Sequence, residues 1–291
     1  MNASPSPTAP VFAWLVLAHA GPDQLRHLLA RLLPPGSPDF AVVHLDAKSP
    51  LWRKTRGRFL ADLPNVTVVE RPAVVRWAHP SQLAATRLLL DEALRRPFTH
   101  AHLVSGADWP LVSRSAMVAD LAEAVPRDCL IEAEPETQAW RMERISLNVR
   151  WLRPDPTNPL AVRWEWLLRR LSQRLPPRRA RPWGPWHKGS QWWSLPRDAC
   201  ERVAVELARG YARGTFRFTQ CADEHAVQTI VAHYFTERLG PPRRHIEWTA
   251  DWSPRILGPA DWARARASGA WLARKLSLEA DPFFLKEQPV R

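Results

Sequence analysis

The chain has 291 residues, of which 45% are hydrophobic and 24% charged, and 41 Lys+Arg against 29 Asp+Glu give a formal net charge of +12. The apolar fraction is too high for a disordered chain, and no Gly-X-Y repeat indicates a collagen-like fibre. No stretch reaches the roughly 18 uncharged apolar residues of a spanning helix. The apolar run at 11–18 lacks the preceding basic residues of a signal peptide.

The positive charge is concentrated in one segment. Residues 141–188 hold twelve cationic residues against three acids, so they carry nine of the twelve net charges. Such a segment can bind nucleic acid, an anionic membrane or a phosphorylated substrate. The composition is weak evidence for any one of these partners. Arg makes up 36 of the 41 cationic residues, and a GC-rich genome also produces that bias.

The first half of the chain predicts strands that alternate with helices. A polar, Pro-rich tail at 1–10 is predicted to be disordered. Apolar or β-branched runs predict strands at 11–18, 40–45, 65–69 and 99–104. Helical spacing predicts helices at 23–33, 80–94 and 113–125. This alternation indicates βαβ units and a Rossmann-like α/β fold with a mostly parallel sheet.

The second half begins with a Pro-rich and Arg-rich break. It contains a predicted helix at 161–175 with apolar residues on one face and Arg163, Arg170 and Arg174 on the other. That helix could lie on an anionic membrane or be an ordinary surface helix. Beyond it we expect strands at 189–195, 244–248 and 270–276, and helices at 196–209, 223–234 and 259–268.

Polar residues follow three of the predicted strands. His19, Asp46 and the Ser105–Asp108 loop come directly after buried runs. In parallel sheets ligands bind beyond the carboxyl ends of the strands, so these residues predict a site at that edge. The three cysteines, Cys129, Cys200 and Cys221, have neither zinc-binding spacing nor an even number, and we expect buried thiols in a reducing compartment.

Eight segments in chain order carry a resemblance to a known family. They are LVLAH (15–19), VVHLDAKS (42–49), RWAHPSQLAATRLLL (76–90), LVSGADWPL (103–111), KGSQWWSLPRD (188–198), ADEHAVQTI (222–230), HIEWT (245–249) and WLARKL (271–276). Their ordered combination resembles the core-2/I-branching β-1,6-N-acetylglucosaminyltransferases, which also include the peptide O-xylosyltransferases. No P-loop, HExxH, GxSxG, zinc-finger or RNA-binding signature competes with this resemblance.

The resemblance implies a single GT-A-type α/β domain over 11–291. Its nucleotide-binding half would span about 11–135, a basic Pro/Arg-rich insertion about 153–187, and the acceptor and catalytic half about 188–291. The implied reaction is inverting transfer of a sugar from a UDP-sugar to a glycan hydroxyl. We expect N-acetylglucosamine as the sugar and xylose as the alternative.

The resemblance also implies that no divalent metal and no other cofactor take part. Most GT-A enzymes bind a metal through Asp-x-Asp, whereas the matching loop here has only Asp108, a predicted donor-binding residue. Members of this family use two cationic side chains on the diphosphate, which match Arg255 and Lys275. Fixed cations stabilise the charge that develops on a departing UDP, as a metal does elsewhere.

Glu224 is the predicted general base. An inverting displacement needs a carboxylate to take the proton of the attacking hydroxyl. The family's base matches Glu224, and we assign the adjacent Asp223 to capping of the following helix.

Further residues are predicted from the resemblance to bind donor or acceptor. Asp46, Ser105 and, more weakly, His19 are predicted to contact the donor. Glu134, Arg141, Arg144, Trp192 and Trp248 are predicted to contact the acceptor, and Trp faces can stack on sugar rings.

The expected setting is bacterial and cytoplasmic, at the inner face of the membrane, with a saccharide or lipid-linked glycan as acceptor. The segment 153–187 would then touch an anionic membrane, and no nucleic-acid partner is expected. Two alternatives stay open: a basic nucleic-acid-binding protein that uses 141–188, and an inactive relative that binds glycans.

Overall fold

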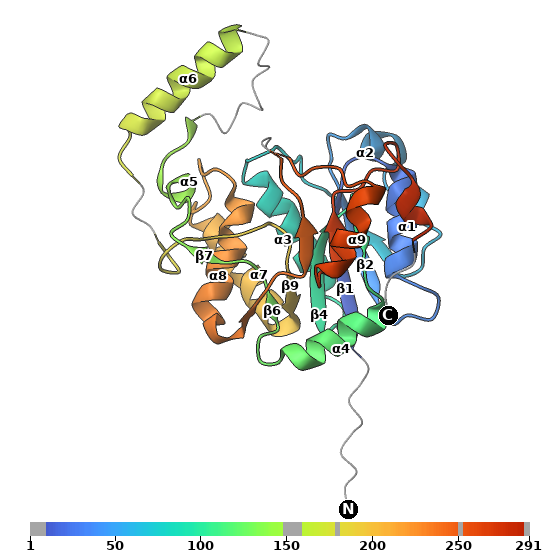
Figure 1. Ribbon diagram of the computed structural model, residues 1–291. Helices are drawn as coiled ribbons and strands as arrows, with labels where there is room; N and C mark the ends of the chain where they lie inside the picture. The colour runs from blue at the N-terminus through green and yellow to red at the C-terminus, as the bar shows by residue number, and fades with distance from the viewer. Residues whose placement is uncertain (1–9, 148–158, 178–180, 250–252, 288–291) are drawn as a thin grey trace, which may run out of the picture.

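The computed structural model describes residues 10–147, 159–177, 181–249 and 253–287 (Figure 1). Its central sheet has seven strands in the order β10-β6-β9-β4-β1-β2-β3. They are β1 (Phe12–Ala18), β2 (Phe40–Leu45), β3 (Val66–Val68), β4 (His100–Ser105), β6 (Cys129–Leu130), β9 (Ser194–Pro196) and β10 (Leu239–Gly240). β1 pairs in parallel with β2 and β4, and β9 runs antiparallel to β4 and β6. The predicted α/β class with a mostly parallel sheet is confirmed.

The apolar run of β1 is explained by burial on both faces of the sheet. Ala13 and Leu15 enter one core cluster, which also contains residues of α3 (Ser81–Ala93), α7 (Arg197–Ala212) and α8 (Ala226–Tyr234). Phe12, Trp14 and Val16 enter the other cluster, with the leucines of α1 (Pro22–Leu32). Successive residues of a strand point to opposite faces, so a strand covered on both sides must be apolar throughout.

Two smaller sheets bring distant segments together. β11 (Arg244–Ile246), β12 (Leu272–Arg274) and β5 (Asp108–Pro110) form one, with β12 in the middle. β7 (Glu134–Pro135) and β8 (His187–Lys188) form the other, pairing Glu134 with Lys188. The three-stranded sheet places β12, from the last part of the chain, beside β5, which comes shortly after β4.

The other elements lie around these sheets. They are α2 (Pro50–Thr55), α4 (Arg114–Ala124), α5 (Trp140–Glu143), α6 (Pro159–Arg174) and α9 (Pro259–Ala267), with 3₁₀ turns at Arg58–Leu60, Ala222–Glu224, Thr236–Arg238 and Phe283–Leu285. Figure 1 shows α6 standing away from the strands, beyond α5. Within the described ranges, no helix combines the length and apolarity needed to cross a bilayer.

Some sequence-based predictions were wrong in detail. The strand predicted at 189–195 is confined to β9, because Gly189 and Ser190 donate their backbone N–H groups to Glu224 O and the Glu132 carboxylate instead of to a strand. Asp108 lies in strand β5 and not in a loop. The three cysteines are free and buried, as predicted. Residues 1–9 of the predicted tail and parts of 153–187 fall outside the described residues.

Candidate active site

A cleft of about 1490 Å³ lies at the carboxyl ends of the parallel strands. His19, Asp46 and Ser105, which follow or end β1, β2 and β4, line it together. The strands lie side by side in the sheet in the order β4-β1-β2, and the carboxyl ends of neighbouring parallel strands lie at the same edge, which explains this gathering. The structure therefore brings together the polar strand ends that the sequence singled out.

Asp46 is a buried carboxylate at this edge. Its Oδ1 accepts hydrogen bonds from the backbone N–H groups of Lys48 and Val75, both at 3.1 Å. The Lys48 ammonium lies 4.0 Å from Oδ2. The side chain thus fixes its own loop against residues 73–75 while it faces the cleft.

Asp108 lies behind the wall of the cleft. It is 1% exposed and is not a lining residue. Its Oδ2 accepts from the Ser105 backbone N–H at 2.9 Å, and its Oδ1 accepts from Arg274 at 2.8 Å. The Arg274 guanidinium, which does line the cleft, lies 4.2 Å from the centre of the Trp192 ring. The Asp108 carboxylate is therefore engaged in holding Ser105 and Arg274.

Glu224 projects into the cleft from a 3₁₀ turn that precedes α8. Its side chain keeps 30% of its surface exposed, and its Oε2 accepts from Arg141 Nη1 at 2.7 Å. The Gly189 backbone N–H donates to Glu224 O at 2.9 Å. A Cβ atom at Gly189 would lie 1.9 Å from Glu132 O, so only glycine permits this close approach. Two chain segments thus fix the position of this exposed carboxylate.

The assignment of Asp223 to helix capping was wrong. α8 is capped by His225, without a side-chain hydrogen bond. Asp223 is instead buried, and its Oδ2 accepts from Gln82 Nε2 at 3.2 Å. Burial, together with the neighbouring Glu224 charge, raises the pKa of Asp223 to about 7. Both adjacent acids line the cleft but they differ in exposure, since Asp223 is 5% exposed and the Glu224 side chain 30%.

The raised pKa of Asp223 predicts a pH-dependent stability. A carboxyl whose pKa is higher in the folded state takes up a proton on folding, so the free energy of unfolding falls as pH rises from about 4 to about 7. Between pH 5 and pH 8 we expect Asp223 to contribute a loss of about 3 kcal/mol. Urea unfolding measures this free energy at each pH. The decrease should be absent in Asp223→Asn, whereas the exposed control Asp23→Asn should show the same decrease as wild type. Parallel pH profiles for wild type and Asp223→Asn would contradict the raised pKa.

The two predicted diphosphate cations occupy different environments. Lys275 lines the cleft, and its Nζ lies 3.3 Å from Ser253 Oγ. Arg255 is not a lining residue, and its Nη2 donates to the carboxylates of Glu247 and Asp261. The backbones of the two cations are in contact, because Lys275 N donates to Arg255 O at 3.4 Å.

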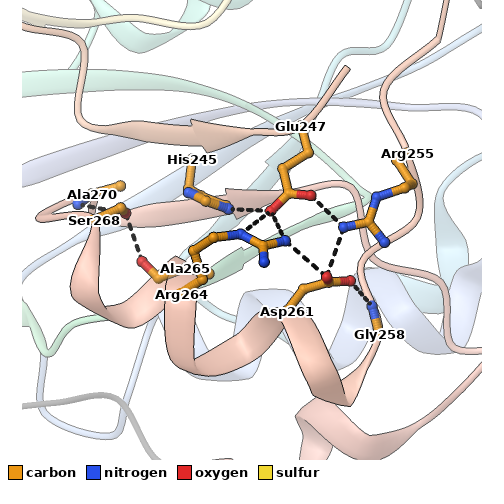
Figure 2. Close-up of polar contacts among 9 residues, drawn as sticks. All are labelled: His245, Glu247, Arg255, Gly258, Asp261, Arg264, Ala265, Ser268 and Ala270. Atoms are coloured by element: carbon orange, nitrogen blue, oxygen red, sulfur yellow. Dashed lines mark hydrogen bonds and ion pairs between the residues drawn. The ribbon is translucent and has the colours of Figure 1, made fainter. Parts of the chain in front are cut away.

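Arg255 belongs to a network of charged side chains beside the cleft (Figure 2). Arg264 bridges Glu247 and Asp261 at 2.6 and 2.9 Å, and His245 Nε2 lies 3.1 Å from Glu247 Oε1. Hydrogen bonding from Arg255, opposed by partial burial, lowers the pKa of Glu247 to about 2. The Nη2 nitrogen of Arg255 would have to leave two ionised partners to bind a phosphate.

The predicted acceptor residues fall into two groups. Arg141, Trp192 and Trp248 line the cleft, and Trp248 is 60% exposed. Glu134 and Arg144 are exposed and do not line it. Trp193, beside Trp192, is entirely buried in the core.

Several charged lining residues were missed from the sequence, among them Glu132, Lys188, Arg244 and Arg274. Arg274 is adjacent to Lys275, and Lys188 begins the KGSQWW segment, so both had a signal in the motifs. Glu132 accepts from the Ser190 backbone N–H at 2.9 Å. In the part of the chain that the structure describes, no group of three His, Cys, Asp or Glu could hold a metal ion.

Comparison with protein families gives one match of wide extent. The model described as "Branch: Core-2/I-Branching enzyme" matches residues 12–267. Comparison with curated protein sequences gives no match.

Among solved structures the similarities are distant. Mouse xyloside xylosyltransferase 1 in its apo form is 13% identical, with 91% of this chain and 97% of that chain covered and a TM-score of 0.40. The WbbM bifunctional glycosyltransferase is 13% identical over 94% of this chain and 46% of its own, with a TM-score of 0.41. A 4-diphosphocytidyl-2C-methyl-D-erythritol synthase is 11% identical over 88% and 98%, with a TM-score of 0.39.

Proposed function

Since this chain belongs to the core-2/I-branching enzyme family and is therefore a glycosyltransferase, we propose that it transfers N-acetylglucosamine from a UDP-sugar to a glycan hydroxyl, with inversion and without a metal ion. Xylose is the second candidate sugar. A saccharide acceptor and a sugar donor follow from the family, whereas the particular sugar, the mechanism and the residues below are the proposal.

One observation carries the proposal: a single cleft gathers a partly exposed carboxylate and several cations from segments far apart in the chain. Glu224 and Arg141 come from the middle of the chain and Lys275 from its end, while Asp46 and Ser105 come from the first strands. A transferase needs this combination, because a hydroxyl must lose a proton while a diphosphate gains charge.

In the proposed step, the acceptor oxygen attacks the anomeric carbon of the donor sugar. Glu224 takes the proton of that hydroxyl, and the bond between the anomeric carbon and the UDP oxygen breaks. The electron pair of this bond leaves with UDP. Arg141, 2.7 Å from Glu224, holds the carboxylate in position for the transfer.

Lys275 would stabilise the negative charge of the departing UDP. An ammonium acts as a point charge on phosphate and replaces part of what a metal ion supplies. The segment that matches the metal-binding loop of other GT-A enzymes supports this division of roles, because its only acid, Asp108, is buried and bound to Arg274 and Ser105. Arg255 would join Lys275 on the diphosphate after release from Glu247 and Asp261.

The acceptor would lie against the aromatic side of the cleft. Trp248 offers an exposed ring, and Trp192 lies under the Arg274 guanidinium. We propose a glycan acceptor, carried on a lipid at the cytoplasmic side of a membrane. Family membership favours this reading over the nucleic-acid alternative.

A donor screen with and without EDTA tests the proposal. UDP release should be fastest from UDP-N-acetylglucosamine and second from UDP-xylose, and EDTA should leave both rates unchanged. An absolute requirement for Mn²⁺ would contradict the replacement of a metal by side-chain cations. If the protein released no UDP but bound DNA with an affinity that falls steeply as salt concentration rises, the result would support the nucleic-acid alternative instead.

A further inference from the structure

Helix α6 leaves a row of apolar side chains uncovered. Trp164, Leu167 and Leu171 follow one another at intervals of three or four residues, so they share one face of the helix, and Leu175 comes directly after its last residue. Their exposed fractions are 62%, 40%, 41% and 37%. A row of this kind on the outside of a protein indicates a surface that meets a partner.

The helix is attached to the rest of the protein from a different side. Ser172 is buried, and its Oγ accepts a hydrogen bond from the Leu147 backbone N–H at 3.0 Å. Ser172 is about 100° around the helix from Leu171. Figure 1 shows α6 beyond α5 and away from the central sheet. The apolar row therefore lies to one side of this attachment and stays exposed.

Arginines border the apolar row. Arg163, Arg170 and Arg174 are exposed and lie along one edge of it, at spacings of seven and four residues. Arg169 adds a fourth guanidinium, against the single acid Glu165 in this helix. An exposed apolar row with Trp, beside a strip of Arg, is the pattern of helices that lie in the plane of a membrane surface.

Charge decides which occupant fits this surface. Two copies of α6 packed face to face would bring eight guanidinium groups together, which opposes self-association. A nucleic acid would use the arginines but leave the apolar row in water. An anionic phospholipid surface complements both, because it offers phosphates at the surface and acyl chains beneath them.

We propose that α6 binds the surface of an anionic phospholipid bilayer. Trp164, Leu167 and Leu171 would enter the boundary between headgroups and acyl chains, with Arg163, Arg170 and Arg174 at the level of the phosphates. Membrane binding by α6 does not depend on the donor and base residues of the cleft. An experiment can therefore contradict membrane binding while the proposed transfer holds, or contradict the transfer while membrane binding holds.

Cosedimentation of the full chain with vesicles tests the proposal. The chain should bind vesicles of phosphatidylcholine mixed with phosphatidylglycerol, and should bind pure phosphatidylcholine far more weakly. The triple variant Arg163→Gln/Arg170→Gln/Arg174→Gln should lower the partition coefficient about 100-fold, since each basic residue near an anionic surface contributes about fivefold. Trp164→Ser/Leu171→Ser should lower it at least about tenfold, by removing buried apolar area.

Matched controls separate α6 from net charge and from misfolding. Arg53→Gln/Arg58→Gln/Arg213→Gln removes three exposed arginines elsewhere, and Val125→Ser/Val205→Ser removes two exposed apolar residues elsewhere. Both should bind vesicles as wild type does, and all four variants should keep the wild-type melting temperature. Equal loss in the controls, or undiminished binding in the α6 variants, would overturn the proposal. A dimer in sedimentation velocity that dissociates in Trp164→Ser/Leu171→Ser, without vesicle binding by wild type, would assign the surface to a second copy.

Discussion

The Glu224→Gln variant is expected to lose transfer by about 10³-fold while it binds UDP as tightly as wild type. A positioned general base contributes roughly 10² to 10⁴ in rate, and the amide cannot take the proton of the acceptor hydroxyl. The amide oxygen can still accept the bond from Arg141, so the position of the side chain should be kept. Steady-state transfer rates and UDP titration calorimetry measure the two effects separately.

Glu201→Gln is the matched control for this prediction. Glu201 lies on α7, with 52% of its side chain exposed, and does not line the cleft. The loss of the Glu201 charge should leave both the transfer rate and the affinity for UDP unchanged. Near-normal turnover by Glu224→Gln would remove Glu224 from the role of base.

Lys275→Ala should weaken UDP binding by at least tenfold. The Lys275 ammonium faces the cleft, and a hydrogen bond or ion pair to a charged group contributes about 1.5–3 kcal/mol. Lys286→Ala, which removes an exposed ammonium near the end of the chain, should leave the affinity unchanged. Calorimetric titration with UDP in EDTA measures the difference without the chemical step.

Arg255→Ala belongs to the same experiment. If its guanidinium leaves Glu247 and Asp261 to contact the diphosphate, its loss should weaken UDP binding by a similar factor. Unchanged affinity in Arg255→Ala would leave it as a member of the ion-pair network in Figure 2. Unchanged affinity in Lys275→Ala would contradict the proposed role of the ammonium.

The first strands and helices were predictable because each has a strong local pattern. β1 is apolar throughout, since both of its faces are covered, and α1 buries Leu25, Leu28, Leu29 and Leu32 at helical spacing. The gathering of His19, Asp46 and Ser105 followed from a general property of parallel sheets. These parts of the site depend on topology, which the order of strands and helices specifies.

Other parts of the site depend on contacts between distant segments. Gly189 and Ser190 bond to Glu224 and Glu132, which a local strand pattern cannot anticipate. Asp223 looked like a helix cap because acids favour helix N-termini, yet tertiary packing buries it against Gln82. The position of Arg274 beside Lys275 does not by itself set it apart from an exposed cation, because its place in the site depends on contacts with Asp108 and Trp192.

The rate of UDP release from UDP-N-acetylglucosamine in EDTA, measured side by side for wild type and Glu224→Gln, is the sharpest test of base-catalysed, metal-independent transfer. We expect full activity in the wild type and a loss of about 10³-fold in the variant, with UDP affinity equal in the two. A wild type that is inactive in EDTA and recovers with Mn²⁺, or a variant as fast as wild type, would contradict it.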